Sequence, residues 1–277
     1  MKSEKRTVGS LLGAAGRALC YLLLFLISQT LISVIYTLTA QIYTMINPGS
    51  NIDPIALVFA CTDQISLISG VATLIVLAAF FLLRRKNPLK EMGFLPTRGR
   101  LVFLGIGLAP LLYLATTLIL GLLPQHWLDE YAEASAALND TGLLMTVATV
   151  IVAPLVEEII FRGLILTRLH RGMPGWLAVL VTALVFGVCH GQVVWMAYAF
   201  VLGAIFGFIA LRARSIWPSL TAHLIFNGIG QLAAFLEHSA LDPWPALLAL
   251  AGAGLLICAA TLIFSLTHPV KAASSDT

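Results

Sequence analysis

Long apolar runs, separated by short polar connections, dominate the order of residues along the chain. The runs cover about residues 19–46, 55–83, 101–123, 143–169, 176–190, 193–211, 216–236 and 244–264. A helix needs about 20 apolar residues to cross the hydrocarbon core of a bilayer, and most of the runs reach that length. The run from Trp176 to His190 is shorter, and the next begins almost at once. The pattern predicts an all-α polytopic membrane protein, a bundle of about eight transmembrane helices.

Basic residues gather in every second connection between the runs. Apart from Arg162 they fall in a few segments, namely residues 2–17, 84–100, 168–171, 212–214 and Lys271. The connection after the third run carries only acids, which are Asp129, Glu130, Glu133 and Asp140. Cytoplasmic loops carry an excess of Lys and Arg, so this distribution predicts that both termini lie in the cytoplasm and that the acidic connection lies outside.

The composition favours a membrane protein and no other broad class. Hydrophobic residues make up 59% of the chain, charged residues 10%, and the mean hydropathy is +0.96. The net charge of +3 comes from short loops, and no basic stripe is long enough to follow a nucleic-acid backbone. We therefore expect an integral, multi-pass protein with the lipid bilayer as partner and no nucleic acid. A compact chain without organelle-targeting signals favours a bacterial plasma membrane.

The fourth run contains charges that a membrane helix rarely carries. The segment V-A-P-L-V-E-E-I-I-F-R-G, residues 152–163, holds Glu157, Glu158 and Arg162. A charged side chain at this depth costs at least a few kcal/mol, so a function is expected. On a helix Glu158 and Arg162 share a face, whereas Glu157 points about 100° away from Glu158. We predict an ion pair between Glu158 and Arg162, with Glu157 free to face a cavity; a buried packing triad without chemistry is the alternative.

Two further pairs of residues place polar groups inside the membrane. Phe186 and His190 are four apart in the fifth run, and His223 and Asn227 are four apart in the seventh, so each pair lies on one helix face. A Glu and a His can together deprotonate a water, and a second His with an Asn amide can donate hydrogen bonds to an oxyanion. These residue types indicate acyl hydrolysis by an activated water. The short turn after His190 predicts a cavity beside it, because non-helical backbone in a membrane lines a cavity or is buried by protein.

The three patterns, taken in order, resemble the signature motifs of a known family. Glu157-Glu158-x-x-x-Arg162, Phe186-x-x-x-His190 and His223-x-x-x-Asn227 are similar to those of the CAAX-protease and bacteriocin-processing (CPBP, or Abi) family of intramembrane proteases, which includes the Ras-converting enzyme. The resemblance covers about residues 142–236. It implies a glutamate-dependent endopeptidase whose substrate is a membrane-associated peptide or protein.

The resemblance also implies roles for single residues. Glu157 would activate a water with help from His190, and His223 and Asn227 would stabilise the oxyanion. The supporting positions would be Glu158, Arg162 and Phe186. The family was first named a metalloprotease, and zinc held by Glu157, His190 and His223 is an alternative; we expect no cofactor, as the better-understood members are interpreted as metal-free. Counting 1.5 Å per residue from the inner span ends sets Glu157 roughly 18 Å deep, His190 roughly 24 Å and His223 roughly 10 Å, which disfavours a common site.

Two rival functions stay open. One is a non-catalytic membrane interaction or bacteriocin-immunity protein, and the other is a proton-coupled transporter that uses Glu157, Glu158 and Asp63 as a relay. Asp63 lies inside the second apolar run, where an interhelical hydrogen bond is the favoured interpretation. We divide the chain into an N-terminal transmembrane region (1–141), a CPBP-like catalytic core (142–237) and a last span with a cytoplasmic tail (238–277). The oligomeric state stays open.

Overall fold

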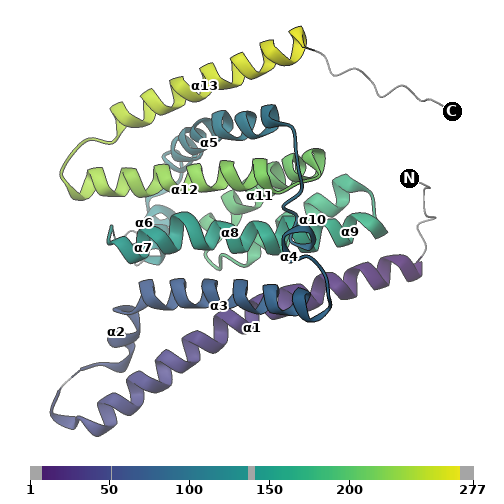
Figure 1. The fold of residues 1–277 in the computed structure, drawn as a ribbon. Coiled ribbons are helices and arrows are strands. Elements are labelled where there is room, and N and C mark those ends of the chain that lie inside the picture. Colours follow the sequence, from purple (N-terminus) through teal and green to yellow (C-terminus); the bar gives the residue numbers. More distant parts are fainter. Residues whose placement is uncertain (1–7, 51, 137–140, 269–277) are drawn as a thin grey trace.

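The computed structural model describes residues 8–50, 52–136 and 141–268, and every regular element in these ranges is a helix (Figure 1). The N-terminal part contains α1 (Val8–Ile46), the short turn η1 (Pro48–Ser50), α2 (Pro54–Phe59), α3 (Thr62–Leu83), α4 (Pro88–Glu91), α5 (Gly99–Leu120) and α6 (Gln125–Ser135). The remainder contains α7 (Leu143–Val147), η3 (Ala148–Val152), α8 (Ala153–Glu157), η4 (Glu158–Leu166), α9 (Thr167–Gly172), α10 (Gly175–Val188), α11 (Val193–Ala213), α12 (Trp217–His238) and α13 (Trp244–Thr267).

The predicted all-helical membrane bundle is confirmed. Within the described residues, 7 helices are long and apolar enough to cross a membrane, and the fourth of them is the continuous stretch Leu143–Gly172, in which α7, η3, α8, η4 and α9 follow one another. Helix α10, at 14 residues, is the shorter apolar helix that the sequence predicted at this place. The protein is therefore an integral, multi-pass membrane protein.

Two details differ from the prediction. The second apolar run is not one span, because the chain breaks between α2 and α3 around Cys61. Asp63 consequently lies in the first turn of α3, where its Oδ1 accepts a hydrogen bond from the backbone N–H of Gln64 at 2.7 Å, and it is not in mid-span. The acidic connection after the third run also contains a helix, α6, which hydropathy alone does not reveal because α6 is largely polar.

The stretch Leu143–Gly172 lies at the centre of the bundle (Figure 1). All nine residues of η4 are buried, and η4 packs against α1, α10 and α11, while α8 packs against α3 and α12. Segments η3 and η4 are π-helical, a conformation that is rare in proteins and frequent at functional sites. Pro154 follows η3 closely and removes a backbone donor from the helix at this point.

A tight contact fixes η4 against the segment that follows α4. A Cβ at Gly163 would collide with the carbonyl of Met92, so only glycine allows this approach. Gly93, which follows Met92, has a φ of +94°, and its carbonyl accepts a hydrogen bond from the backbone N–H of Ile216 at 3.1 Å. The Ser215 hydroxyl donates to the carbonyl of Leu95 at 2.6 Å. The segment after α4 thus connects η4 with the start of α12.

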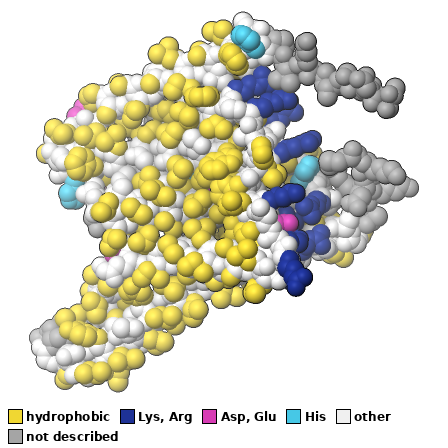
Figure 2. All heavy atoms as spheres, viewed as in Figure 1, with side chains coloured by type: hydrophobic (Ala, Val, Ile, Leu, Met, Phe, Trp, Pro, Cys, Tyr) yellow, Lys and Arg dark blue, Asp and Glu magenta, His cyan; other side chains and the backbone are white. Residues whose placement is uncertain are grey.

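Lys and Arg side chains gather at one end of the molecule, where α1 begins and α13 ends (Figures 1 and 2). At this end Glu91 forms ion pairs with Lys86 at 3.4 Å and with Arg168 at 2.8 Å. The positive-inside rule assigns such an end to the cytoplasm. The orientation with both termini inside stays a prediction based on this distribution.

Candidate active site

One cavity of about 450 Å³ lies among α5, α8, α10, α11 and α12. Its lining includes the four residues that the sequence singled out as catalytic, which are Glu157, His190, His223 and Asn227. Three separate helices supply them, because Glu157 ends α8, His190 follows α10, and the other two lie on α12. The structure therefore brings these residues to one place.

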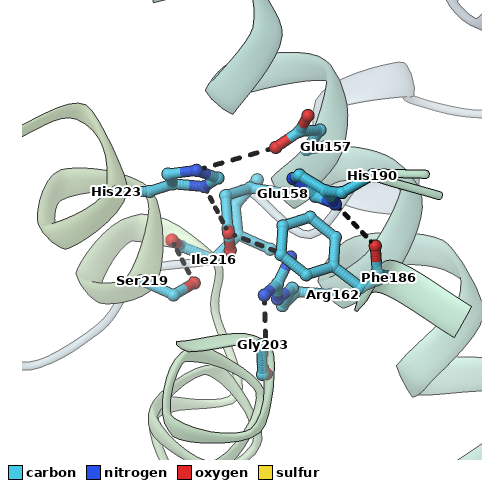
Figure 3. A network of polar contacts seen from close by, with 9 residues as sticks. All are labelled: Glu157, Glu158, Arg162, Phe186, His190, Gly203, Ile216, Ser219 and His223. Atoms are coloured by element: carbon cyan, nitrogen blue, oxygen red, sulfur yellow. Dashed lines mark hydrogen bonds and ion pairs between the residues drawn. The ribbon is translucent and has the colours of Figure 1, made fainter. Parts of the chain in front are cut away.

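Glu158 is removed from this cavity and lies in the protein interior (Figure 3). Its side chain is 0% exposed, and its Oε1 lies 3.2 Å from Nη1 of Arg162, the ion pair that the helical spacing predicted. The same oxygen lies 3.0 Å from Nδ1 of His223. A buried carboxylate needs such partners, because the loss of hydration is not otherwise compensated.

Arg162 is held by aromatic and backbone groups as well as by Glu158. Its guanidinium carbon lies 4.4 Å from the centre of the Phe186 ring, and its Nη2 donates to the carbonyl of Gly203 at 3.4 Å. A guanidinium over a ring face is attracted by the ring quadrupole, most strongly where water is excluded. Phe186 therefore serves as a support for the buried cation, a role that its spacing to His190 did not reveal.

His223 lies between the two glutamates (Figure 3). Its Nδ1 is 3.0 Å from Glu158 and its Nε2 is 3.6 Å from Oε2 of Glu157. A carboxylate only accepts, so the Nδ1 next to the ion-paired Glu158 is the donor. The opposite nitrogen, Nε2, then faces the cavity on the side of Glu157.

The tautomer of His190 follows from a hydrogen bond to the last turn of α10, the helix that precedes it. Its Nδ1 lies 2.8 Å from the carbonyl oxygen of Phe186, and a carbonyl only accepts, so Nδ1 carries a hydrogen. In the neutral ring Nε2 is then a free acceptor, and Figure 3 shows this nitrogen on the side of Glu157. The chain turns directly afterwards at Gly191, whose φ is +76°, as the expected turn beside a cavity requires.

Asn227 is oriented by the irregular helix opposite. Its Nδ2 donates to the carbonyl of Thr149 at 2.8 Å, and Thr149 lies in the π-helical segment η3. The amide has a second hydrogen on the same nitrogen. One hydrogen fixes the side chain, and the residue lines the cavity.

The structure corrects the estimate of depth. Counting residues from span ends set Glu157, His190 and His223 at different levels, whereas all three line the same cavity and His223 is close to Glu157. The count assumed regular, upright helices with known ends. Helix α10 is short and the stretch around Glu157 is partly π-helical, so neither assumption holds.

Several lining residues were missed by sequence reasoning. The ring of Trp195 lies 5.4 Å from that of His190, and the hydroxyls of Tyr131 and Tyr198 are 3.3 Å apart at the same cavity. Aromatic residues are common in membrane helices, so their types gave no signal. Tyr131 comes from α6, in the connection that hydropathy treated as a loop.

The zinc alternative places Glu157, His190 and His223 around one ion. In residues 8–50, 52–136 and 141–268, no three His, Cys, Asp or Glu side chains are placed to hold one metal ion. The proposed relay of acids also lacks support, because Asp63 is absent from the cavity lining that contains Glu157.

Comparisons with known proteins agree with the motifs. Residues 139–229 match the family described as type II CAAX prenyl endopeptidase Rce1-like. This match confirms the resemblance to CPBP-family proteases that the sequence predicted. A protein of Bacillus subtilis (strain 168), named "Putative membrane peptidase YdiL", is 33% identical over 84 residues, which is 30% of this chain and 34% of that protein. The match thus spans about a third of the relative's length. No solved structure matches the chain.

Proposed function

We propose that this protein is an intramembrane endopeptidase that cleaves membrane-associated peptides or proteins with a water activated by Glu157 and His190. The observation that carries the proposal is the common cavity of Glu157, His190, His223 and Asn227 inside the segment that matches the protease family. The carboxylate, the imidazoles and the amide are the groups that hydrolysis by an activated water requires.

In the proposed first step, a water lies between the Glu157 carboxylate and Nε2 of His190. Glu157 takes one proton of the water, and the oxygen attacks the carbonyl carbon of the scissile peptide bond. His190 accepts a hydrogen bond from the same water through Nε2, because Nδ1 already donates to Phe186. The proton on Glu157 then passes to the leaving amine when the C–N bond breaks, which regenerates the carboxylate.

The negative charge on the tetrahedral intermediate is proposed to face α12. His223 would donate from Nε2, and Glu158 would stabilise the positive ring through Nδ1. Asn227 would donate the hydrogen that Thr149 does not use. Preorganised donors of this kind commonly contribute about 10²–10³ in rate each.

The expected substrate class follows from the chemistry and the location of the cavity. The cavity lies among membrane helices and combines apolar and aromatic walls with the catalytic groups, which suits an extended peptide that enters from the bilayer. A transporter has less support, because Asp63 is absent from the lining of the cavity that contains Glu157. Metal-free chemistry is part of the proposal, because a carboxylate and an imidazole together can activate a water without a metal ion.

The proposal is tested by comparing membrane peptidomes of cells that express the wild-type chain, Glu157→Ala or His190→Ala at matched abundance. We expect new chain ends only with the wild type. Activity of the purified protein in detergent micelles, where no proton gradient exists, separates a protease from a transporter. Identical chain ends in all three samples, together with a phenotype that persists in the variants, would support a binding or immunity protein.

A further inference from the structure

A second, larger pocket lies at the basic end of the molecule, away from the candidate active site. Its volume is about 1060 Å³, and its charged lining consists of Arg98, Arg100, Arg212 and Arg214. We call it the arginine pocket. Its lining shares no residue with the cavity around Glu157, and no acidic side chain is part of it.

The four arginines are brought together by the backbone. Arg98 immediately precedes α5, and Arg214 ends α11 with a φ of 54°. The Thr97 hydroxyl donates to the carbonyl of Ala213 at 3.4 Å, which joins the two segments. Within the part of the chain that the structure describes, none of the four takes part in an ion pair. Four positive charges around one pocket favour an anionic ligand over a neutral or cationic one.

Apolar side chains of two candidate membrane helices form part of the remaining wall. Leu101 and Leu104 of α5 and Leu262 of α13 line it. Apolar side chains continue outward from it on the surface of both helices, where Phe103 is 58% exposed and Leu266 is 80% exposed. A ligand here meets cations at the end of the bundle and apolar surface along the helices. A soluble anion would contact only the cations, whereas an anionic amphiphile would contact both the cations and the apolar surface.

We propose that the arginine pocket binds the phosphate headgroup of an anionic phospholipid, with the acyl chains along α5 and α13. Arginine forks suit phosphate oxygens, and basic pockets between membrane helices at the cytoplasmic side are suited to such headgroups. The positive-inside rule assigns this end to the cytoplasm, where the leaflet carries anionic lipid. The lipid would anchor the end of α11, and α11 also supplies Trp195 and Tyr198 to the other cavity.

The test uses the full chain in detergent, with three probes: phosphatidylglycerol, phosphatidylcholine with the same acyl chains, and glycerol 3-phosphate. Native mass spectrometry measures retained lipid, and thermal unfolding measures stabilisation. We expect phosphatidylglycerol to be retained and to raise the melting temperature, with much weaker effects of the other two. Equal binding of phosphatidylcholine would overturn the proposal. Equal binding of glycerol 3-phosphate would identify a soluble phosphate ester and also overturn it.

Charge-matched variants locate the site. Arg98→Gln/Arg214→Gln should weaken phosphatidylglycerol binding about thirty-fold, roughly fivefold for each charge. The control Arg171→Gln/Arg85→Gln removes two exposed arginines elsewhere on the basic end, and Arg85 shares the φ of 54° with Arg214. Equal losses in both double variants would overturn a specific pocket.

Should the glutamine variant fail to fold, Arg98→Lys/Arg214→Lys keeps the charges and removes the forks. This lysine variant should bind phosphatidylglycerol less tightly than the wild type does. Added salt should steadily weaken phosphatidylglycerol binding by the wild type. Binding that is insensitive to both would contradict the proposal.

Discussion

The two sides of the helix formed by α8 and η4 give neighbouring carboxylates different surroundings. On one side, Glu158 is 0% exposed and lies 3.2 Å from Arg162 and 3.0 Å from His223. On the other, Glu157 is 21% exposed, lines the cavity and lies 3.6 Å from His223. The difference teaches that two identical side chains, adjacent in sequence, acquire different surroundings from the helices around them: Glu158 is the counterion of the buried Arg162, and Glu157 is accessible from the cavity.

The largest expected effect comes from removing the charge on the cavity side. Glu157→Gln should lower the rate of chain-end formation by about 10²–10⁴-fold, because a carboxamide cannot take a proton from water. The melting temperature should stay close to that of the wild type, since Glu157 is partly exposed. Purified proteins are compared for cleavage and for thermal unfolding in the same detergent.

Asp63→Asn is the matched control, because it removes an acid at the start of α3. Full cleavage activity of Asp63→Asn would show that the loss in Glu157→Gln is specific to the acid in the cavity. Equal loss in both variants would favour a relay of acids and would count against Glu157 as a separate base.

The same substitution on the buried side should act on stability. Glu158→Gln leaves Arg162 buried without its counterion, and breaking a buried ion pair costs about 3–5 kcal/mol of unfolding free energy. The measurement is the free energy of reversible unfolding in mixed micelles of a mild and a denaturing detergent.

A double variant separates the charge from the packing. Glu158→Leu/Arg162→Leu removes both members, so it should regain much of the stability that Glu158→Gln loses while its cleavage stays low, because His223 has lost its partner. A double variant as unstable as Glu158→Gln would mean that the ion pair is not the source of the effect.

The smallest effect is expected for Asn227 on α12. Asn227→Ala should lower cleavage by about 10²-fold as an oxyanion donor, and should cost about 1 kcal/mol through the lost hydrogen bond to Thr149. Initial rates and unfolding curves are measured on the same preparation. A stability loss without a rate loss would assign Asn227 to helix packing alone.

Some of the site follows from local geometry. Residues four apart share a helix face, so the ion pair of Glu158 with Arg162 and the divergence of Glu157 were predictable from spacing. The aromatic support of Arg162 by Phe186, the contact of His223 with Glu158 and the bond of Asn227 to Thr149 were not, because each joins different helices. Their relative tilt and rotation are set by packing, which no pattern along one helix encodes.

The sequence by itself determined that the chain forms apolar helices, roughly where each one lies, and which of them carry polar groups. In lipid every backbone group must find its partner within the helix, so a run of apolar residues is nearly sufficient to specify a span. Only the tertiary structure decided where the second run breaks, that α6 contributes Tyr131, and that Glu157, His190 and His223 reach one cavity despite their unequal counted depths. The shared cavity depends on how α5, α8, α10, α11 and α12 pack against one another, and this packing acts between helices rather than along them.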